Sequence, residues 1–362
     1  MKIKLFDRAF SDEDKANVEV ALSSGWVTEG PWAERVEDRL MKITGSRHVI
    51  LFPSGTIALW AAFRTHANMT ARSVDPHDVV NRGPSVACIP DHTFCATLAA
   101  ALEAGWLCRL VDSDMNSMEV SGELTVPVHL YGSIMKIPNG VKPGERIDDA
   151  CQALGVYDED SVHAGGTAKA AALSFYADKL CTSGEGGAVF TNDPEFADRL
   201  RVFKNVGRHK RGGYLHPYHG LTLRMTDMQC ALLYGQLGRL EEIRANRTAV
   251  EAAYLKYVKL ETNQVWNAGI KRMPNRFIYK TLDPDRLIAW MEKKGVECRR
   301  TFVPLHRNPW TENRPGITRM PSYGRSWGAY QGTVYLPFGM NLTTEQAEEI
   351  GRMINNYEDD VR

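Results

Sequence analysis

Short, continuously apolar runs alternate with helical patterns over roughly the first 200 residues of the chain. The apolar runs do not alternate with polar residues at every second position, and strands buried on both faces of a parallel sheet have this pattern. We therefore predict an α/β fold with a mainly parallel sheet. The predicted strands are residues 86–90, 107–112, 125–130, 171–177 and 187–191.

The pattern changes near Thr226. The sequence from Thr226 to Gln229 matches a capping box, and apolar residues at helical spacing continue beyond it, which predicts one long helix through Tyr254. We expect this helix to connect a large domain, residues 1–235, with a smaller α+β domain, residues 236–362. The smaller domain is predicted to contain strands at residues 276–280 and 298–303 and helices at residues 283–294 and 342–357.

Two connections between predicted strands have little helical character. Residues 113–124 are unusually few for a parallel crossover and have the sequence of an extended loop, and residues 132–145 are rich in Pro and Gly. A parallel crossover normally includes a helix. We therefore predict that both crossovers have lost their helix and that one face of the sheet is less covered, with a partner subunit as a candidate cover.

Composition limits the class of protein. Lysine and arginine together number 44, as do aspartate and glutamate, so the formal net charge is zero and gives no indication of nucleic-acid binding. No apolar run approaches membrane-spanning length, and the charged N-terminal residues do not resemble a signal peptide. The seven cysteines are scattered without a C-x-x-C pair, which favours reduced thiols over disulfides or a zinc site. We expect a cytoplasmic protein without a bound metal.

The most informative candidate residue is Lys179. It follows the predicted strand at residues 171–177 and precedes a glycine-rich turn that ends at Gly187. A lysine at a strand end is usually a solvated surface residue. The same placement also suits a lysine that forms a Schiff base with an aldehyde cofactor and then surrenders it to an amine substrate.

Other candidates lie near the ends of predicted strands, where open α/β sheets bind ligands. Gly55 and Thr56, in a Ser-Gly-Thr sequence before a helical run, form either a phosphate cradle of backbone amides or an ordinary helix cap. One carboxylate of the pair Asp148 and Asp149 could keep a pyridine nitrogen protonated, or both could cap a following helix, and the cap is the interpretation favoured for Asp148. Phe94 is placed either to stack on a planar cofactor or to fill the core.

Several motifs occur in a fixed order along the chain. They are Ser54-Gly-Thr, Thr93-Phe-x-Ala-Thr, Val128-His-Leu-Tyr-Gly, Asp149-Ala-x-Gln-Ala, Ser174-Phe-x-x-x-Lys with Gly-Glu-Gly-Gly, and Pro304-Leu-His. With this ordered set the chain resembles the DegT/StrS-type nucleotide-sugar aminotransferases. These are pyridoxal phosphate (PLP) enzymes with the aspartate-aminotransferase fold, also called fold type I. The resemblance implies a large PLP-binding lobe with a mainly parallel sheet and a smaller C-terminal α+β lobe.

The resemblance also implies roles for individual residues. Lys179 would be the catalytic lysine that holds PLP as a Schiff base, and Asp149 would pair with the pyridinium nitrogen. Gln152 would lie near the cofactor ring or its O3′ oxygen. The other implied contacts are Gly55, Thr56 and Ser174 with the phosphate, Phe94 with the ring face, and Glu185, His306 and Arg224 with the substrate.

The implied reaction is a two-step transamination. L-glutamate, or glutamine, gives its amino group to the cofactor, which passes it to a keto group of a nucleotide-linked sugar, expected to be a 4-keto-6-deoxy sugar. A lysine at position 179 favours amination over the sugar dehydration catalysed by relatives with a histidine there. The alternatives are amination of a keto-cyclitol, PLP-dependent dehydration, and a non-catalytic relative that kept the fold.

A homodimer with shared active sites is a further implication. The family usually has an asparagine that reaches the neighbouring subunit's cofactor phosphate, and Thr222 stands at this position in the sequence Gly220-Leu-Thr-Leu-Arg224. Because threonine is shorter and offers a hydroxyl in place of an amide, we expect this contact to differ here.

Overall fold

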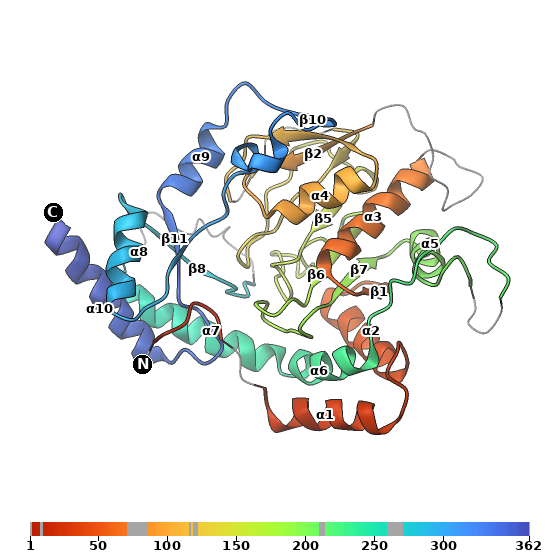
Figure 1. Ribbon diagram of the computed structural model, residues 1–362, viewed down its shortest axis with the longest axis horizontal. Coiled ribbons are helices and arrows are strands. Elements are labelled where there is room, and N and C mark those ends of the chain that lie inside the picture. Colours follow the sequence, from red (N-terminus) through yellow and green to blue (C-terminus); the bar gives the residue numbers. More distant parts are fainter. Residues whose placement is uncertain are drawn as a thin grey trace.

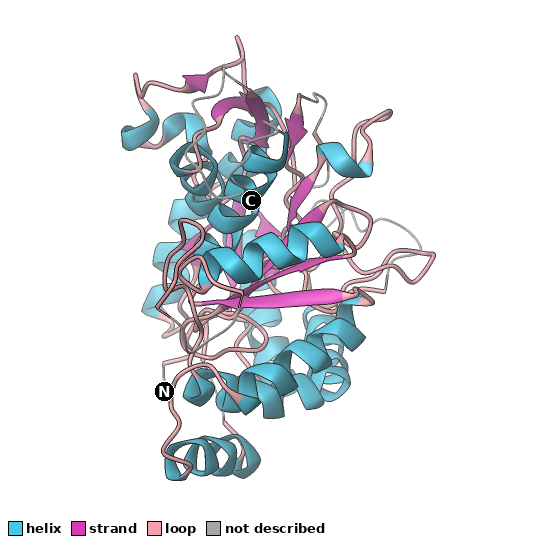
Figure 2. Ribbon diagram, turned by 90° about the vertical axis from the view of Figure 1, so that its right-hand side faces the viewer, coloured by secondary structure: helices cyan, strands magenta, loops and turns pink. Residues whose placement is uncertain are grey.

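The computed structural model describes residues 2–7, 10–70, 85–115, 117–118, 122–209, 214–258 and 271–361. A large central sheet carries helices on both sides, and a smaller sheet lies beside it (Figures 1 and 2). The predicted α/β class is therefore confirmed. Within the described ranges, no helix is both long and apolar enough to cross a membrane.

The central sheet is assembled from two four-stranded parts. One has the order β1 (His48–Phe52), β7 (Gly187–Thr191), β6 (Ala170–Ser174), β5 (Ile147–Asp149). The other has the order β10 (Ile317–Thr318), β3 (Leu107–Val111), β2 (Val86–Pro90), β4 (Leu124–Thr125). Parallel bridges from Thr125 to Arg146 and from Val128 to Asp149 join β4 to β5, so that the parts form one surface. Among the described strands of this surface, only β7 runs antiparallel to its neighbours.

Most of the strand predictions for the first half are confirmed. β2 and β7 have the predicted bounds, and β3 and β6 are shorter than predicted. The continuous strand at residues 125–130 was wrong, because β4 ends at Thr125 and Pro127 has no N–H to donate to a neighbouring strand. β1, a run of apolar residues that buries four of its five positions, was not predicted.

Helices cover the two faces of the sheet as separate layers. On one face, α3 (Gly55–Thr70), α4 (Cys95–Glu103) and α5 (Pro194–Lys204) bury Ile50 and Phe52 of β1. On the other face, α2 (Pro31–Thr44) and α6 (Asp227–Gly238) bury Val49 and Leu51 of the same strand, and α1 (Asp12–Ser23) packs against the outside of α6 (Figure 1). Because successive strand residues enter different cores, the strand sequences are apolar at most positions.

The two helix-poor crossovers were predicted correctly. The described part of residues 113–124 holds no helix, and residues 132–145 hold a single 3-10 turn, η1 (Pro143–Glu145). The sheet face beneath them is nevertheless covered. Cys88 and Val111 on this face are fully buried, and Met118 and Met135 pack against them from the crossover loops, with Met320 at the edge. The expectation of a less covered face is therefore wrong at these strands, because flexible methionine side chains fill the space that a helix would occupy.

The single long helix predicted after Thr226 is two helices. The predicted capping box begins α6, since the Gln229 N–H donates to the Thr226 side chain. The chain then turns at Arg239 and continues as α7 (Leu240–Leu255). The Arg239 guanidinium donates to the Ser11 hydroxyl (2.6 Å) and to Asp14 Oδ2 (2.8 Å), which fixes this turn against the start of α1.

The C-terminal part contains a three-stranded antiparallel sheet, with the predicted helices packed against it. Its strands are β8 (Phe277–Lys280), β11 (Thr333–Leu336) and β9 (Arg299–Arg300), and its helices are α8 (Pro284–Lys293) and α10 (Thr344–Val361). The intervening segment contains η2 (Leu305–Arg307), η3 (Pro309–Thr311), β10 and α9 (Gly324–Gln331). β10 pairs with β3, so a stretch assigned by the sequence to the smaller domain extends the large sheet.

Candidate active site

A cavity of 730 Å³ lies where the carboxyl ends of β5 and β6 face the C-terminal sheet. Both halves of the chain contribute to its lining. The sequence-predicted site residues on its surface are Gly55, Thr56, Phe94, Asp149, Gln152, Ser174, Lys179 and Glu185.

Asp149 is the last residue of β5 and is 6% exposed. The Thr97 hydroxyl donates to its Oδ2 (2.7 Å), and the Cys151 N–H donates to its Oδ1 (3.0 Å). The two bonds fix the plane of the carboxylate at the cavity wall. Thr97 lies within a motif that the sequence singled out, but its contact with Asp149 was not predicted.

Asp148 does not cap a helix, because the next element after β5 in the described structure is the strand β6. Successive strand residues point to opposite faces, and Asp148 accepts two bonds from the Arg146 guanidinium (3.1 and 2.7 Å) and one from His129 Nε2 (3.1 Å). The Met135 N–H donates to His129 Nδ1, so the ring proton lies on Nε2. Burial alone would raise the pKa of Asp148, but His129 and Arg146 together bring it below its ordinary value. Asp148 is therefore part of a structural ion pair.

Lys179 presents its amine to the cavity from the turn after β6. Its Nζ makes no hydrogen bond to another residue in the described parts of the chain, whereas its backbone N–H donates to Tyr176 O (2.9 Å). Burial lowers the pKa of Lys179, the Asp178 carboxylate opposes this shift, and the Arg276 guanidinium adds to it. A lowered pKa increases the fraction of neutral amine, which is the nucleophilic form.

Arg276 was not predicted as a site residue. It is 4% exposed, lines the cavity and pairs with Asp178 through Nη2 and Oδ2 (2.7 Å). No local sequence pattern connects it with Lys179, because it reaches the site from the start of β8. It brings a fixed positive charge from the C-terminal half close to the lysine.

Gly55 and Thr56 begin α3 at the mouth of the cavity. The Ser54 hydroxyl accepts from the Ile57 N–H (3.2 Å), whereas the amides of Gly55 and Thr56 have no acceptor among the described residues. Gly187 permits this turn to lie against the sheet, because a Cβ there would lie 2.4 Å from Ser54 O. Two free amides at a helix start, next to the Ser174 hydroxyl, are suited to bind an anion.

An aromatic wall closes the opposite side of the cavity. The ring of Phe94, 53% exposed, lies 5.5 Å from that of Phe302, which in turn contacts Tyr131 and Tyr335. Phe302 belongs to residues 299–303, all of which line the cavity. The sequence singled out Phe94 but missed the other rings, because they lie more than 200 residues further along the chain or in the core.

Two expected substrate contacts, His306 and Arg224, lie outside the cavity lining. His306 donates from Nδ1 to Asp91, and Arg224 donates to Asn205 Oδ1 (3.2 Å). Thr222 is exposed and is bridged to Asn205. Glu185 lies on the cavity rim, where its backbone carbonyl accepts from the Gln229 amide (2.9 Å). Within one chain, therefore, Glu185 alone of the three expected substrate contacts reaches the cavity.

The sequence model of the DegT/DnrJ/EryC1/StrS aminotransferase family matches residues 9–355. The chain belongs to this family. Like the DegT/DnrJ/EryC1/StrS aminotransferases as a class, it is a PLP-dependent sugar aminotransferase, which confirms the resemblance seen in its motifs. Its relatives include a GDP-perosamine synthase of Caulobacter vibrioides, 25% identical over 315 residues that cover 80% of this chain and 81% of the relative.

Solved structures of other proteins have the same fold. DesV of S. venezuelae, in complex with a ketimine intermediate, is 25% identical and superposes with a TM-score of 0.81 over 95% of this chain and 94% of its own. The PLP form of a sugar aminotransferase from Streptococcus pneumoniae superposes with a TM-score of 0.87 over the full length of both chains at 18% identity. The type I aminotransferase fold predicted from the motifs is therefore confirmed.

Proposed function

We propose that this aminotransferase moves an amino group from L-glutamate to a keto group of a nucleotide-linked sugar, with Lys179 as its catalytic residue. The observation that carries the proposal is the convergence of three groups on one cavity: the unpaired Lys179 amine, the oriented Asp149 carboxylate and the free amides of Gly55 and Thr56. An amine, a carboxylate and an anion site are what the aldehyde, the ring nitrogen and the phosphate of PLP require.

The remaining lining residues fit the cofactor in the same orientation. The Gly55 and Thr56 amides and the Ser174 hydroxyl would hold the phosphate, with Phe94 against one face of the ring. Gln152 Oε1 accepts from the Tyr131 N–H (3.0 Å), which leaves its Nε2 to donate to the ring oxygen. Asp149 would hold a proton on the ring nitrogen.

Lys179 would move the proton in both steps. Bound PLP supplies the electron sink that makes the substrate C–H bond acidic. The Lys179 amine would move the proton from the donor carbon to the cofactor C4′ in the first step and from C4′ to the acceptor carbon in the second. Burial of the amine and the nearby Arg276 charge both favour its neutral, basic form.

Names of relatives and the charges of the cavity support a nucleotide-linked acceptor. GDP-perosamine synthases of two organisms are among the relatives. Arg299 lines the cavity with 63% of its side chain exposed, so it could meet an anionic group although the net charge of the chain is zero. A keto-cyclitol, which carries no phosphate, is the alternative acceptor.

We also infer a homodimer in the cytoplasm. Exposed apolar side chains surround the cavity mouth, including Phe94, Tyr176 and Val303, and a second copy would bury them. All seven cysteines are free thiols, as in a reducing compartment. Light scattering of the purified protein tests the dimer.

An absorbance spectrum with PLP tests the function. A visible band should form when Lys179 condenses with the aldehyde and should bleach when L-glutamate is added. Recovery of the band on addition of a nucleotide-linked keto-sugar, but not of a keto-cyclitol, completes the assignment. If glutamine bleaches the band and glutamate does not, glutamine is the amino donor. A protein that forms no band overturns the proposal.

Replacing Gly187 by alanine should weaken PLP binding about tenfold, the loss expected for about one hydrogen bond to a charged group. The new Cβ would lie 2.4 Å from Ser54 O and 2.6 Å from Gly55 N, so the turn that carries the free amides must shift. Fluorescence titration with PLP measures the affinity. Gly144→Ala is the matched control, because nothing lies within 4 Å of its Cβ. Unchanged affinity in the Gly187 variant would show that this turn does not hold the phosphate.

Replacing Asp178 by asparagine should lower the pKa of Lys179 further. The Asp178 charge raises this pKa, and its removal also leaves the positive charge of Arg276 uncompensated beside the amine. Because the neutral amine is the reactive form, the pH profile for the rate of PLP condensation should shift to lower pH than in the wild type. Asp285→Asn, which breaks the exposed pair with Arg300, is the control and should leave the profile in place. A shift to higher pH would contradict the assignment.

A further inference from the structure

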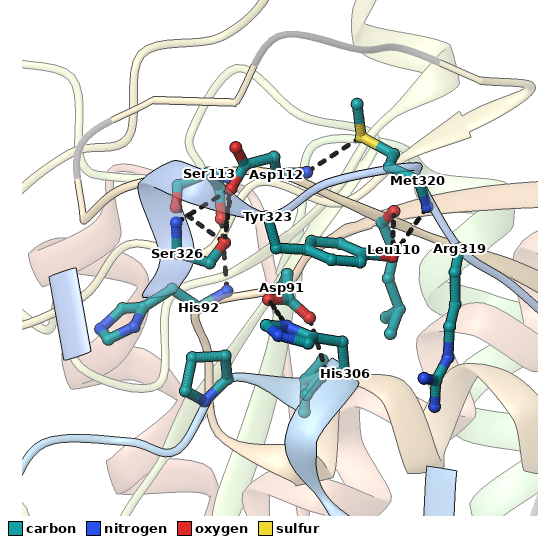
Figure 3. A network of polar contacts seen from close by, with 12 residues as sticks. Asp91, His92, Leu110, Asp112, Ser113, His306, Arg319, Met320, Tyr323 and Ser326 are labelled. Atoms are coloured by element: carbon teal, nitrogen blue, oxygen red, sulfur yellow. Dashed lines mark hydrogen bonds and ion pairs between the residues drawn. The ribbon is translucent and has the colours of Figure 1, made fainter. Parts of the chain in front are cut away.

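Two aspartates at neighbouring strand ends bind the C-terminal segment that crosses the large sheet. Asp91 follows β2 and Asp112 follows β3 (Figure 3). Asp91 is fully buried and accepts from the backbone N–H of His306 at Oδ1 (2.7 Å) and from His306 Nδ1 at Oδ2 (2.6 Å). Its carbonyl also accepts from the Leu305 N–H (2.8 Å). Three hydrogen bonds thus join one strand-end residue to the turn η2.

The His306 ring is held from its face as well. It stacks on Tyr323 with the ring centroids 4.3 Å apart and the planes 6° from parallel (Figure 3). The Tyr323 hydroxyl donates to Leu110 O (3.3 Å) and accepts from the Met320 N–H (2.9 Å), so it is fixed to β3. The imidazole is therefore confined between a carboxylate and an aromatic ring, neither of which lines the cavity.

The turn fixed by Asp91 is the end of the cavity wall. Residues 299–303 line the cavity and lead directly into η2, and Asn308 lines it immediately afterwards. At its other end the wall is fixed by β9, where Arg300 pairs with Val334 of β11. Between these two anchors Phe302 has contacts with other rings and no backbone pairing in the described strands. Thr301 shares a hydrogen bond with the Thr333 hydroxyl (2.6 Å), and the backbone of Phe302 interacts with the Tyr131 hydroxyl. The Asn308 amide donates to Val303 O (3.2 Å), so the far end of the wall is joined to the turn that the Asp91–His306 contact fixes.

We propose that Asp91 and His306 are positioning residues that set the acceptor side of the cavity by holding the wall at residues 299–303. This inference rests on the proposed function, since it assigns the wall to recognition of the keto-sugar. His306 then acts on the substrate through the wall and not by touching it. The cofactor side, with Lys179 and Asp149, is built on β5 and β6 and does not depend on this contact.

Asp112 provides an internal control. It accepts from the N–H (2.9 Å) and hydroxyl (3.0 Å) of Ser326 and from the Arg325 N–H (3.1 Å), and so it holds the start of α9. Ser326 is fully buried, and none of the residues of α9 lines the cavity. Ser326→Ala therefore removes a hydrogen bond to Asp112 and an interaction of the same hydroxyl with Asp91, but it leaves both bonds from His306 to Asp91 in place.

The test compares His306→Phe, His306→Asn and Ser326→Ala in the PLP-loaded protein. Phenylalanine keeps a planar ring against Tyr323 but cannot donate to Asp91, whereas the asparagine amide can donate from the position of Nδ1. His306→Phe should raise KM for the keto-sugar about tenfold, while the rate of the glutamate step stays within about twofold of the wild type. His306→Asn should recover most of this loss, and Ser326→Ala should leave KM unchanged.

Trypsin digestion supplies a readout that needs no turnover. In His306→Phe, cleavage after Arg299 and Arg307 should accelerate, whereas in Ser326→Ala any acceleration should occur after Arg319 and Arg325. The inference is overturned if His306→Phe matches Ser326→Ala in both KM and cleavage, or if it slows the glutamate step as much as the acceptor step. A wild-type protein that binds PLP but aminates no keto-sugar overturns the proposed function, and the cleavage pattern still tests the positioning.

Discussion

Lys179→Ala is expected to abolish amino transfer while the protein remains folded. The variant loses both the group that condenses with PLP and the base that moves the substrate proton, so we expect the rate to fall by about 10³-fold or more. Because Nζ makes no hydrogen bond in the described structure, the melting temperature should change little. Turnover with glutamate and keto-sugar measures the first effect, and calorimetry measures the second.

Lys179→Arg is the control for charge. Arginine keeps a cation in the cavity but stays protonated at neutral pH, so it should be as inactive as alanine. Retained amination in either variant would remove Lys179 from the mechanism. A variant that unfolds would instead point to a structural role for this lysine.

Asp149→Asn should slow the glutamate step by about 10²- to 10³-fold, the usual cost of removing one preorganised electrostatic group. The change preserves the size of the side chain and one oxygen that can accept from Thr97, but it removes the negative charge next to the ring nitrogen. Single-turnover bleaching of the PLP band by glutamate measures the rate. A rate close to that of the wild type would show that the charge at this position is not used.

Asp148, the residue before Asp149, is expected to affect stability and not the reaction. Asp148→Asn breaks the buried pair with Arg146 and should lower the free energy of unfolding by about 3 to 5 kcal/mol. It should have little direct effect on the glutamate step in the molecules that remain folded. Of the two adjacent aspartates, Asp149 would thus affect the rate of the glutamate step and Asp148 the stability of the fold.

The opposite roles of these aspartates could have been predicted more fully from the sequence. Strand residues alternate between faces, so Asp148 and Asp149 could not both face the ligand. Asp149 was correctly favoured as the cavity residue, but Asp148 was interpreted as the cap of a following helix, and the element that follows is the strand β6. The basic residue two positions before Asp148 and His129 on the adjacent chain segment were the available signal for an ion pair.

Local signals predicted local structure well. The apolar runs of β2 and β7 and the capping box at Thr226 were placed correctly, because each depends on residues close in sequence. The break at Arg239 was missed, because it depends on acceptors more than 220 residues earlier, in Ser11 and Asp14.

The cavity shows the same division between local and distant signals. Lys179, Asp149 and the Ser-Gly-Thr turn belong to motifs that the sequence displays. Arg276 and Phe302 reach the cavity from strands of the smaller sheet, and no local pattern in the sequence predicts where that sheet lies. The wall at residues 299–303 was therefore the part of the cavity that the sequence predicted least.

The pairing of β10 with β3 has a consequence for biosynthesis. A ribosome releases the chain from the N-terminus, and β3 leaves it some 200 residues before β10 and α9. Until then the outer edge of β3 lacks its partner strand, and Asp91 and Asp112 lack the groups that hold them. The nascent large sheet thus carries an open edge through most of its synthesis, and the last third of the chain closes it.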